Sequence, residues 1–247
     1  MKKRRAVQTL LLVITVVLVL GLLAGARSAD WRTASREPVG LAPDPAATPE
    51  AVVQVYCART VGARGVFGVH TWVAVKPPRA AGYVVYEVTG WKLRWSESAV
   101  SVRAREPDAR WFGAEPELYA ELRGKQAEAL LGRIDAAAKS YPFAGEYRAW
   151  PGPNSNTFTA WITRQVPELR ADLPPTAIGK DYLRGKVLAS APSGRGLQFS
   201  LAGLLALTAS SVEGLELNVL GLSFGVDPWP PALKLPLAGR LGASSAP

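Results

Sequence analysis

The sequence predicts an α+β fold in which an antiparallel sheet packs against two or three helices, preceded by one transmembrane helix. Three observations support this prediction: an uncharged apolar run over residues 6–26, strand-like segments rich in Val, Tyr and Trp after residue 50, and later segments with helical spacing. We therefore divide the chain into an anchor or signal segment (1–29), a flexible tether (30–50), an exported globular domain (51–227) and a Pro-rich tail (228–247).

The N-terminal segment predicts the location of the protein. The run 6–26 matches the roughly 20 apolar residues that span a bilayer, and Lys2, Lys3, Arg4 and Arg5 precede it. The positive-inside rule keeps these basic residues in the cytoplasm, so the domain is expected on the non-cytoplasmic (periplasmic or extracellular) side of the cell membrane. The run exceeds a signal-peptide core of about 7–15 residues, which favours a retained single-pass anchor, although Ala24-Gly25-Ala26 offers a cleavage site.

Charge and composition limit the partners. The formal net charge is +9, and five of the basic residues lie in 1–29, which leaves the exported part at +4. Such a mild excess does not predict nucleic acid binding. A single Cys, Cys57, and a single His, His70, exclude an intramolecular disulfide and a tetrahedral Cys/His metal site. We expect no metal or cofactor, and we expect a membrane contact through the N-terminal helix.

The elements follow in order along the domain. Residues 30–50 are rich in Ala and Pro without a periodic apolar face, which is typical of a tether. The next three segments are rich in Val, Tyr and Trp and are separated by Gly or Pro, which predicts an antiparallel meander over residues 51–57, 66–76 and 83–93.

Helices are expected in the middle of the domain and strands at its end. Pro116 and the spacing of Leu118 and Leu122 predict a short helix that stops at Gly124, and a second helix is expected over 125–140. Asn154-Ser155-Asn156 has the composition of an N-cap for a third helix. Apolar runs at 197–207 and 215–226 predict a hairpin, followed by a loosely packed tail.

Two polar positions are candidates for chemistry. His70 lies in a strand-like run, where period two places it on one face with Trp72, and imidazole is the usual base near neutral pH. Ser155 lies at a helix start, where free N–H groups stabilise a developing oxyanion. Each has a structural alternative, because a strand His is often a satisfied core residue and Ser is a common N-cap.

A resemblance adds to this reasoning. The strings His70-Thr71-Trp72 and 151–158 (PGPNSNTF) resemble an uncharacterised bacterial domain-of-unknown-function family of membrane-anchored proteins. They are more distantly similar to the circularly permuted papain-like superfamily, which includes lecithin retinol acyltransferase. In that superfamily a strand His precedes an Asn-Cys-x-x-Phe helix start. The resemblance implies a papain-like core with Ser155 in place of Cys.

Two functional hypotheses follow. In the first, the protein is an envelope amidase, esterase or acyltransferase, in which Ser155 is the nucleophile, His70 the general base and Glu87 the residue that orients the His. Asn154, Asn156 and Trp72 would then bind the substrate. In the second, the protein is a catalytically inactive, membrane-tethered binding domain for peptidoglycan, a lipid or an envelope protein. Cys57 is a rival nucleophile, but its apolar strand favours a buried thiol.

Overall fold

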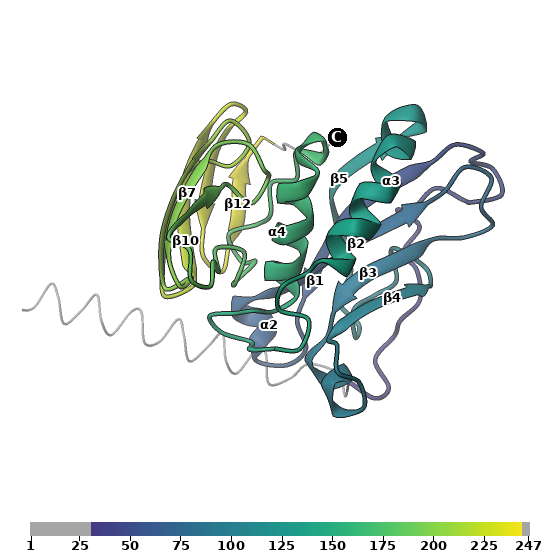
Figure 1. The fold of residues 1–247 in the computed structure, drawn as a ribbon, viewed down its shortest axis with the longest axis horizontal. Helices are drawn as coiled ribbons and strands as arrows, with labels where there is room; N and C mark the ends of the chain where they lie inside the picture. Colours follow the sequence, from purple (N-terminus) through teal and green to yellow (C-terminus); the bar gives the residue numbers. More distant parts are fainter. Residues whose placement is uncertain (1–30, 244–247) are drawn as a thin grey trace, which may run out of the picture.

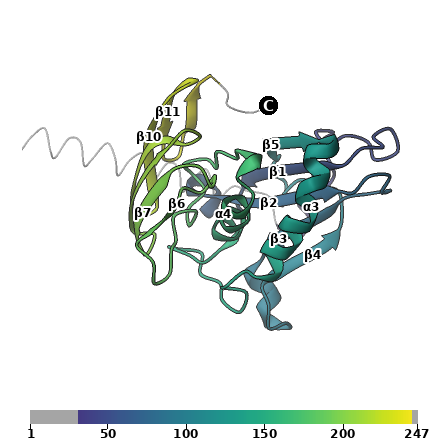
Figure 2. The ribbon, with the colours of Figure 1, turned by 45° about the horizontal axis from the view of Figure 1, so that its top comes forward.

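The computed structural model describes residues 31–243. The predicted anchor at 1–29 lies outside the described residues. Two antiparallel sheets flank a central helix, as both views show (Figures 1 and 2). Within residues 31–243, no helix combines the length and apolarity needed to cross a bilayer. The α+β class with antiparallel sheets is confirmed, but residues 31–243 build two sheets where one was expected.

The first sheet has five strands, and its central strands are buried on both faces. In the order across the sheet these are β4 (Val100–Ala104), β3 (Val84–Val88), β2 (Val69–Lys76), β1 (Val52–Arg59) and β5 (Glu117–Arg123). Their Val-rich composition suits strands covered on both sides. The meander of β1, β2 and β3 is therefore confirmed, and β4 and β5 extend it at the two edges.

Two helices cover one face of this sheet. Helix α3 (Gly124–Lys139) buries Leu130 and Ile134, and helix α4 (Ser155–Gln165) buries Phe158 and Ile162 in the same apolar core. The spacing of these residues by four places them on one side of each helix. Both helices agree with the sequence prediction. Short helical turns complete the fold: α2 (Arg64–Phe67), η1 (Gly90–Arg94) and η2 (Pro167–Leu169).

The opposite face of the five-stranded sheet is covered by residues 35–50, which we call the strap. Pro38 forms an isolated bridge with Ala109, and the Asp108 carboxylate accepts hydrogen bonds from the backbone N–H groups of Leu41 and Ala42. Farther along, the Tyr83 hydroxyl donates to the carbonyl of Pro43. This segment differs from the flexible tether that its composition predicted, because Asp108 and Tyr83 hold it from distant positions in the chain.

The predicted short helix before Gly124 is wrong. Residues 117–123 form strand β5 instead, which pairs with β1 with a register shift between Val55 and Tyr56. Leu118 and Leu122 are four residues apart, a spacing that places both on one side of a helix, whereas the register shift in β5 places Leu118 on the strap side of the sheet and Leu122 on the helix side. The fully buried β1 requires a hydrogen-bonding neighbour on each side, and this requirement decides the outcome.

The C-terminal region forms a seven-stranded meander rather than one hairpin and a tail. Turns at 202–204 and 220–221 divide the predicted long strands, and the Pro-rich region after residue 227 contributes two strands. The strands are β6 (Leu188–Ser190), β7 (Leu197–Leu201), β8 (Leu205–Ser210), β9 (Gly214–Val219), β10 (Leu222–Pro228), β11 (Pro231–Leu235) and β12 (Gly239–Gly242). They pair in sequence order, so each strand lies beside the next.

Helix α4 joins the two sheets. On its second face, Arg164 donates to the carbonyl of Ser190 and to the side chain of Gln198, and Thr163 donates to the carbonyl of Pro192. Figure 1 shows α4 between the seven-stranded sheet and strands β1 and β2. The molecule is therefore layered as strap, five-stranded sheet, helices and seven-stranded sheet.

The start of α4 is fixed by a capping box. Asn154 accepts hydrogen bonds from the backbone N–H groups of Asn156 and Thr157, while the Thr157 hydroxyl accepts from the backbone N–H of Asn154. Gly179 lies against this cap with φ of +98°, and a Cβ there would lie 2.4 Å from Nδ2 of Asn154. Both the backbone conformation and the available space require glycine at this position.

We predict that Gly179→Ala lowers the free energy of unfolding by about 2–4 kcal/mol, because the added methyl displaces the cap and strains the backbone. Gly132→Ala is the matched control, since Gly132 is an exposed residue of α3 with no atom within 4 Å of its Cβ position. That control should be neutral or stabilise by up to about 1 kcal/mol. Denaturant titration of the full chain measures both, and equal effects of the two substitutions would contradict the prediction.

Candidate functional site

His70 and Glu87 meet on the strap side of the five-stranded sheet. His70 Nε2 lies 3.0 Å from Glu87 Oε2, and the two side chains are 4% and 0% exposed. Glu87 also accepts a hydrogen bond from Arg103 at 3.1 Å and forms an ion pair with Arg105 at 3.6 Å. The sequence prediction that Glu87 partners His70 is thus matched by this geometry.

The protonation of the pair follows from burial and from the two arginines. Burial lowers the pKa of His70, and this outweighs the hydrogen bond and charge of Glu87, which raise it. Burial alone would raise the pKa of Glu87, but the His70 hydrogen bond and the charges of His70, Arg105 and Arg103 lower it to about 2. At neutral pH we therefore assign a neutral His70 that donates its Nε2–H to a Glu87 carboxylate.

Aromatic rings seal this pair from solvent. The Trp111 ring stacks on the His70 ring with centroids 3.6 Å apart and planes at 10°, and Trp91 stacks on Trp111. Trp72 lies 5.7 Å from His70, and its Nε1 donates to the carbonyl of Pro107. Trp72 is fully buried in the core under the strap, so it is not placed to bind a substrate as predicted.

Ser155 lies on the other side of the same sheet. Its helix packs on the face formed by Thr71 and Val73, and the Thr71 hydroxyl lies 3.3 Å from the Ser155 carbonyl and 3.0 Å from Asn156 Oδ1. His70 precedes Thr71 in β2, and adjacent strand residues point to opposite faces. The sheet therefore separates Ser155 from His70, and the hypothesised nucleophile and base do not share a site.

The two asparagines predicted to bind substrate hold the backbone instead. Asn154 caps α4 and donates Nδ2 to the carbonyls of Ala149 and Ile178. Asn156 donates Nδ2 to the carbonyls of Val69 and Ile178, which ties α4 to strand β2. Both residues are buried, and their polar groups form hydrogen bonds within the protein.

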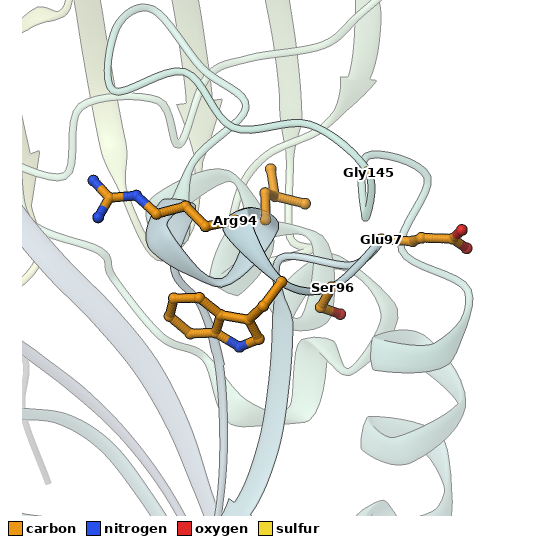
Figure 3. Close-up of a pocket in the computed structure, with 6 residues that line it drawn as sticks. Arg94, Ser96, Glu97 and Gly145 are labelled. Atoms are coloured by element: carbon orange, nitrogen blue, oxygen red, sulfur yellow. The ribbon is translucent and has the colours of Figure 1, made fainter.

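The remaining candidates for chemistry are also unsuited to it. Cys57 is buried in the core on the helix side, and burial raises the pKa of its thiol. A shallow pocket opens beside η1, but Arg94 and Glu97 extend away from each other there (Figure 3). Within residues 31–243, no group of three or more His, Cys, Asp or Glu residues could hold a metal ion.

The seven-stranded sheet is a stronger candidate for a functional site, because it buries polar side chains and exposes apolar ones. Alternate residues that face α4 are polar and buried, including Gln198, Thr208, Glu216, Asn218 and Lys234. The side away from α4, which we call the outer face, exposes thirteen large apolar side chains by 38–73%. These are Leu188, Leu197, Leu201, Leu205, Leu207, Leu215, Leu217, Val219, Leu222, Phe224, Val226, Leu233 and Leu241.

The inward side chains form a buried ionic network. Lys234 Nζ lies 2.6 Å from Asp172 Oδ1 and 3.0 Å from Glu216 Oε1, and Lys180 pairs with the second oxygen of Glu216. Arg240 pairs with Asp172 at 3.0 Å and with Asp227 at 2.8 Å. Buried charges persist only when paired, and here three cations alternate with three carboxylates.

Comparison with known proteins places the chain in a family. A profile described as "Protein of unknown function (DUF3750)" matches residues 50–182, more than half of the 247 residues. The chain belongs to the DUF3750 family. No curated protein and no solved structure matches it.

The DUF3750 match includes the five-stranded sheet, both long helices and the segment that carries Lys180 and Asp181. His70, Glu87 and Ser155 all lie within it. Strands β6–β12 follow the matched range, so the outer face is built from residues beyond it. Sequence alternation in the strands of residues 197–226 contains the signal for this face, since apolar residues, most of them Leu, recur there at every second position.

We predict that Glu87→Gln lowers the free energy of unfolding by about 3 kcal/mol at neutral pH, because it leaves Arg105 buried beside an uncharged amide. Glu128→Gln, at an exposed position of α3, is the matched control and should have little effect. Urea titrations of the full chain measure both. Equal stability of the Glu87→Gln variant and the wild-type protein would contradict the assignment.

The same pair predicts how stability depends on pH. The pKa of Glu87 falls from 4.5 to about 2 on folding, so its stabilisation is complete above pH 4.5 and is lost as pH falls toward 2. The difference between wild-type protein and Glu87→Gln should therefore shrink over that window. The lowered pKa of His70 adds a loss of stability below pH 6.5. A difference that stays constant from pH 7 to pH 2 would contradict this prediction.

Proposed function

We propose that this protein is a non-catalytic binding protein of the cell envelope, held in the membrane by residues 6–26, with the outer face of the seven-stranded sheet as its binding surface. One observation carries the proposal: thirteen large apolar side chains form a continuous exposed face without a charged residue. Contiguous apolar patches on soluble monomers are usually about 300–600 Å² or smaller, and larger ones mark interaction sites.

The size of the face supports a contact rather than chance exposure. The thirteen side chains are roughly half exposed and together present apolar surface on the order of 1,000 Å². Pairing connects them across the strands, for example from Leu207 to Leu217 and from Leu217 to Phe224. The apolar side chains of these neighbouring strands offer a partner no hydrogen-bonding groups. Binding at the outer face is therefore driven by the removal of apolar surface from water.

The site geometry favours binding over turnover. His70 is enclosed by Trp111, and its hydrogen-bond partner is Glu87 rather than a nucleophile. A general base must lie within about 3 Å of the atom that carries the proton, and Ser155 lies across the sheet from His70. The membrane location rests on the basic cluster and the apolar run in the sequence.

We predict that a fluorophosphonate probe does not label Ser155 in the full chain, because His70 lies across the sheet from its hydroxyl group. Ser155→Ala is the matched control, and mass spectrometry of the tryptic peptide measures the adduct. Labelling of the wild-type protein that disappears in Ser155→Ala would overturn the non-catalytic assignment.

We predict that the outer face is covered in the native membrane. In a Cys57→Ala background, Leu217→Cys should react with a membrane-impermeant maleimide about tenfold more slowly than Glu128→Cys, because the core of an interface excludes water. Membranes containing the full chain are labelled before and after denaturation, which should abolish the difference. Equal rates in the native membranes would contradict the proposal.

A further inference from the structure

We infer that the occupant of the outer face is a second copy of this chain, packed sheet against sheet about a two-fold axis. This inference deepens the proposed function and rests on it, since it names the partner of the same surface. Three features support it: the place where the chain enters the fold, the chemistry of the outer face, and the area of that face.

The bilayer is a competing occupant of the outer face. The described chain begins at Trp31, whose ring contacts Phe112 on the strap side of the five-stranded sheet. The sheet and the helix layer separate the strap from the seven-stranded sheet, and each layer adds about 10 Å. Residues 27–30 span at most about 14 Å. A bilayer that ends beside Trp31 is therefore not positioned to cover the outer face as well.

The chemistry of the outer face suits contact with a second copy of the same face. A two-fold contact brings the same surface together with itself, so any charge near the axis would oppose its own copy. The outer face satisfies this constraint, because every charged residue of β9, β10 and β11 points inward: Glu216, Asp227 and Lys234. The side chains are Leu and Val with one exposed Phe, which resembles a domain core cut in half, as in obligate homodimers. Transient partner surfaces are instead enriched in Tyr, Trp and Arg.

The area and packing of the outer face also suit a two-fold contact. Surface on the order of 1,000 Å² per copy is comparable to the roughly 800 Å² per partner of a standard stable interface. The alternating rows of β7–β10 can interdigitate with an identical sheet about 10 Å away, as the two halves of a β-sandwich do. Strand β9 is the middle strand of the seven, which places Leu217 close to the axis. A two-fold axis normal to the membrane allows both anchors to share one bilayer.

The test counts subunits of the full chain in a membrane. The Cys57→Ala, Glu128→Cys protein carries a fluorophore on α3, away from the outer face, and is reconstituted at low density into phosphatidylcholine vesicles. Single-molecule photobleaching should show two steps. Leu217→Lys should weaken association at least about tenfold and give single steps, because it places two like charges at the axis. Val102→Lys, an exposed aliphatic residue of β4, is the matched control and should leave two steps.

The remaining outcomes separate this inference from the proposed function. Single steps for the labelled protein that retains Leu217 would overturn the inference. If Leu217→Cys is nonetheless protected in native membranes, lipid or a different protein covers the face and the proposed function stands. A spin label at position 217 of the reconstituted protein then distinguishes two cases: access by oxygen but not by a nickel chelate assigns the face to lipid, and access by the nickel chelate assigns it to water. Either result overturns the two-fold contact.

Discussion

The architecture depends on the buried ionic network between the two sheets. Lys180 and Asp172 come from the segment after α4, and they pair with Glu216, Lys234 and Arg240 of the seven-stranded sheet. Removing one member would leave an uncompensated charge in the interior, which costs several kcal/mol. The network therefore fixes which face of the sheet turns inward. Since strand residues alternate, the same choice turns every leucine of β7–β10 outward.

Alternation has a comparable effect in the five-stranded sheet. In β2, Thr71 meets the start of α4, whereas His70 and Trp72 face the strap. A displacement by one residue would have brought the imidazole to Ser155. Instead, the polar residues of the motif serve the fold: Asn154 and Asn156 hold the start of α4, and Glu87 is neutralised by Arg103 and Arg105. The parts that resemble a catalytic motif are distributed over two faces.

The two halves of the molecule thus differ in what they offer to other molecules. The DUF3750 region buries its unusual residues, including the only His and the only Cys. The strands that follow it bury their polar residues and expose their apolar ones. The buried reactive groups and the charge-free outer face of the seven-stranded sheet are the two observations that support the proposed binding function.

Local sequence was sufficient for elements whose signals are local. The strands β1 and β2, helix α3, and the Asn154 cap of α4 followed from periodicity and from capping residues. Alternation also indicated which residues share a face with His70 in its strand and with Glu87 in the next, although the register between β2 and β3 could not be predicted. The sequence prediction failed at residues 117–123, because Leu118 and Leu122 have the spacing of a helix face, and only the need of β1 for a second hydrogen-bonding neighbour selects strand β5.

The α+β class, the apolar run with its basic flank and the absence of a disulfide framework follow from the amino-acid sequence alone. Tertiary structure alone decided that Ser155 and His70 lie on opposite faces and that the Pro-rich end completes a sheet. It also decided that the leucines of that sheet point outward. The reason is physical: a period-two pattern defines two faces but not which is buried, and the charges of Asp172 and Lys180, distant in sequence, make that choice.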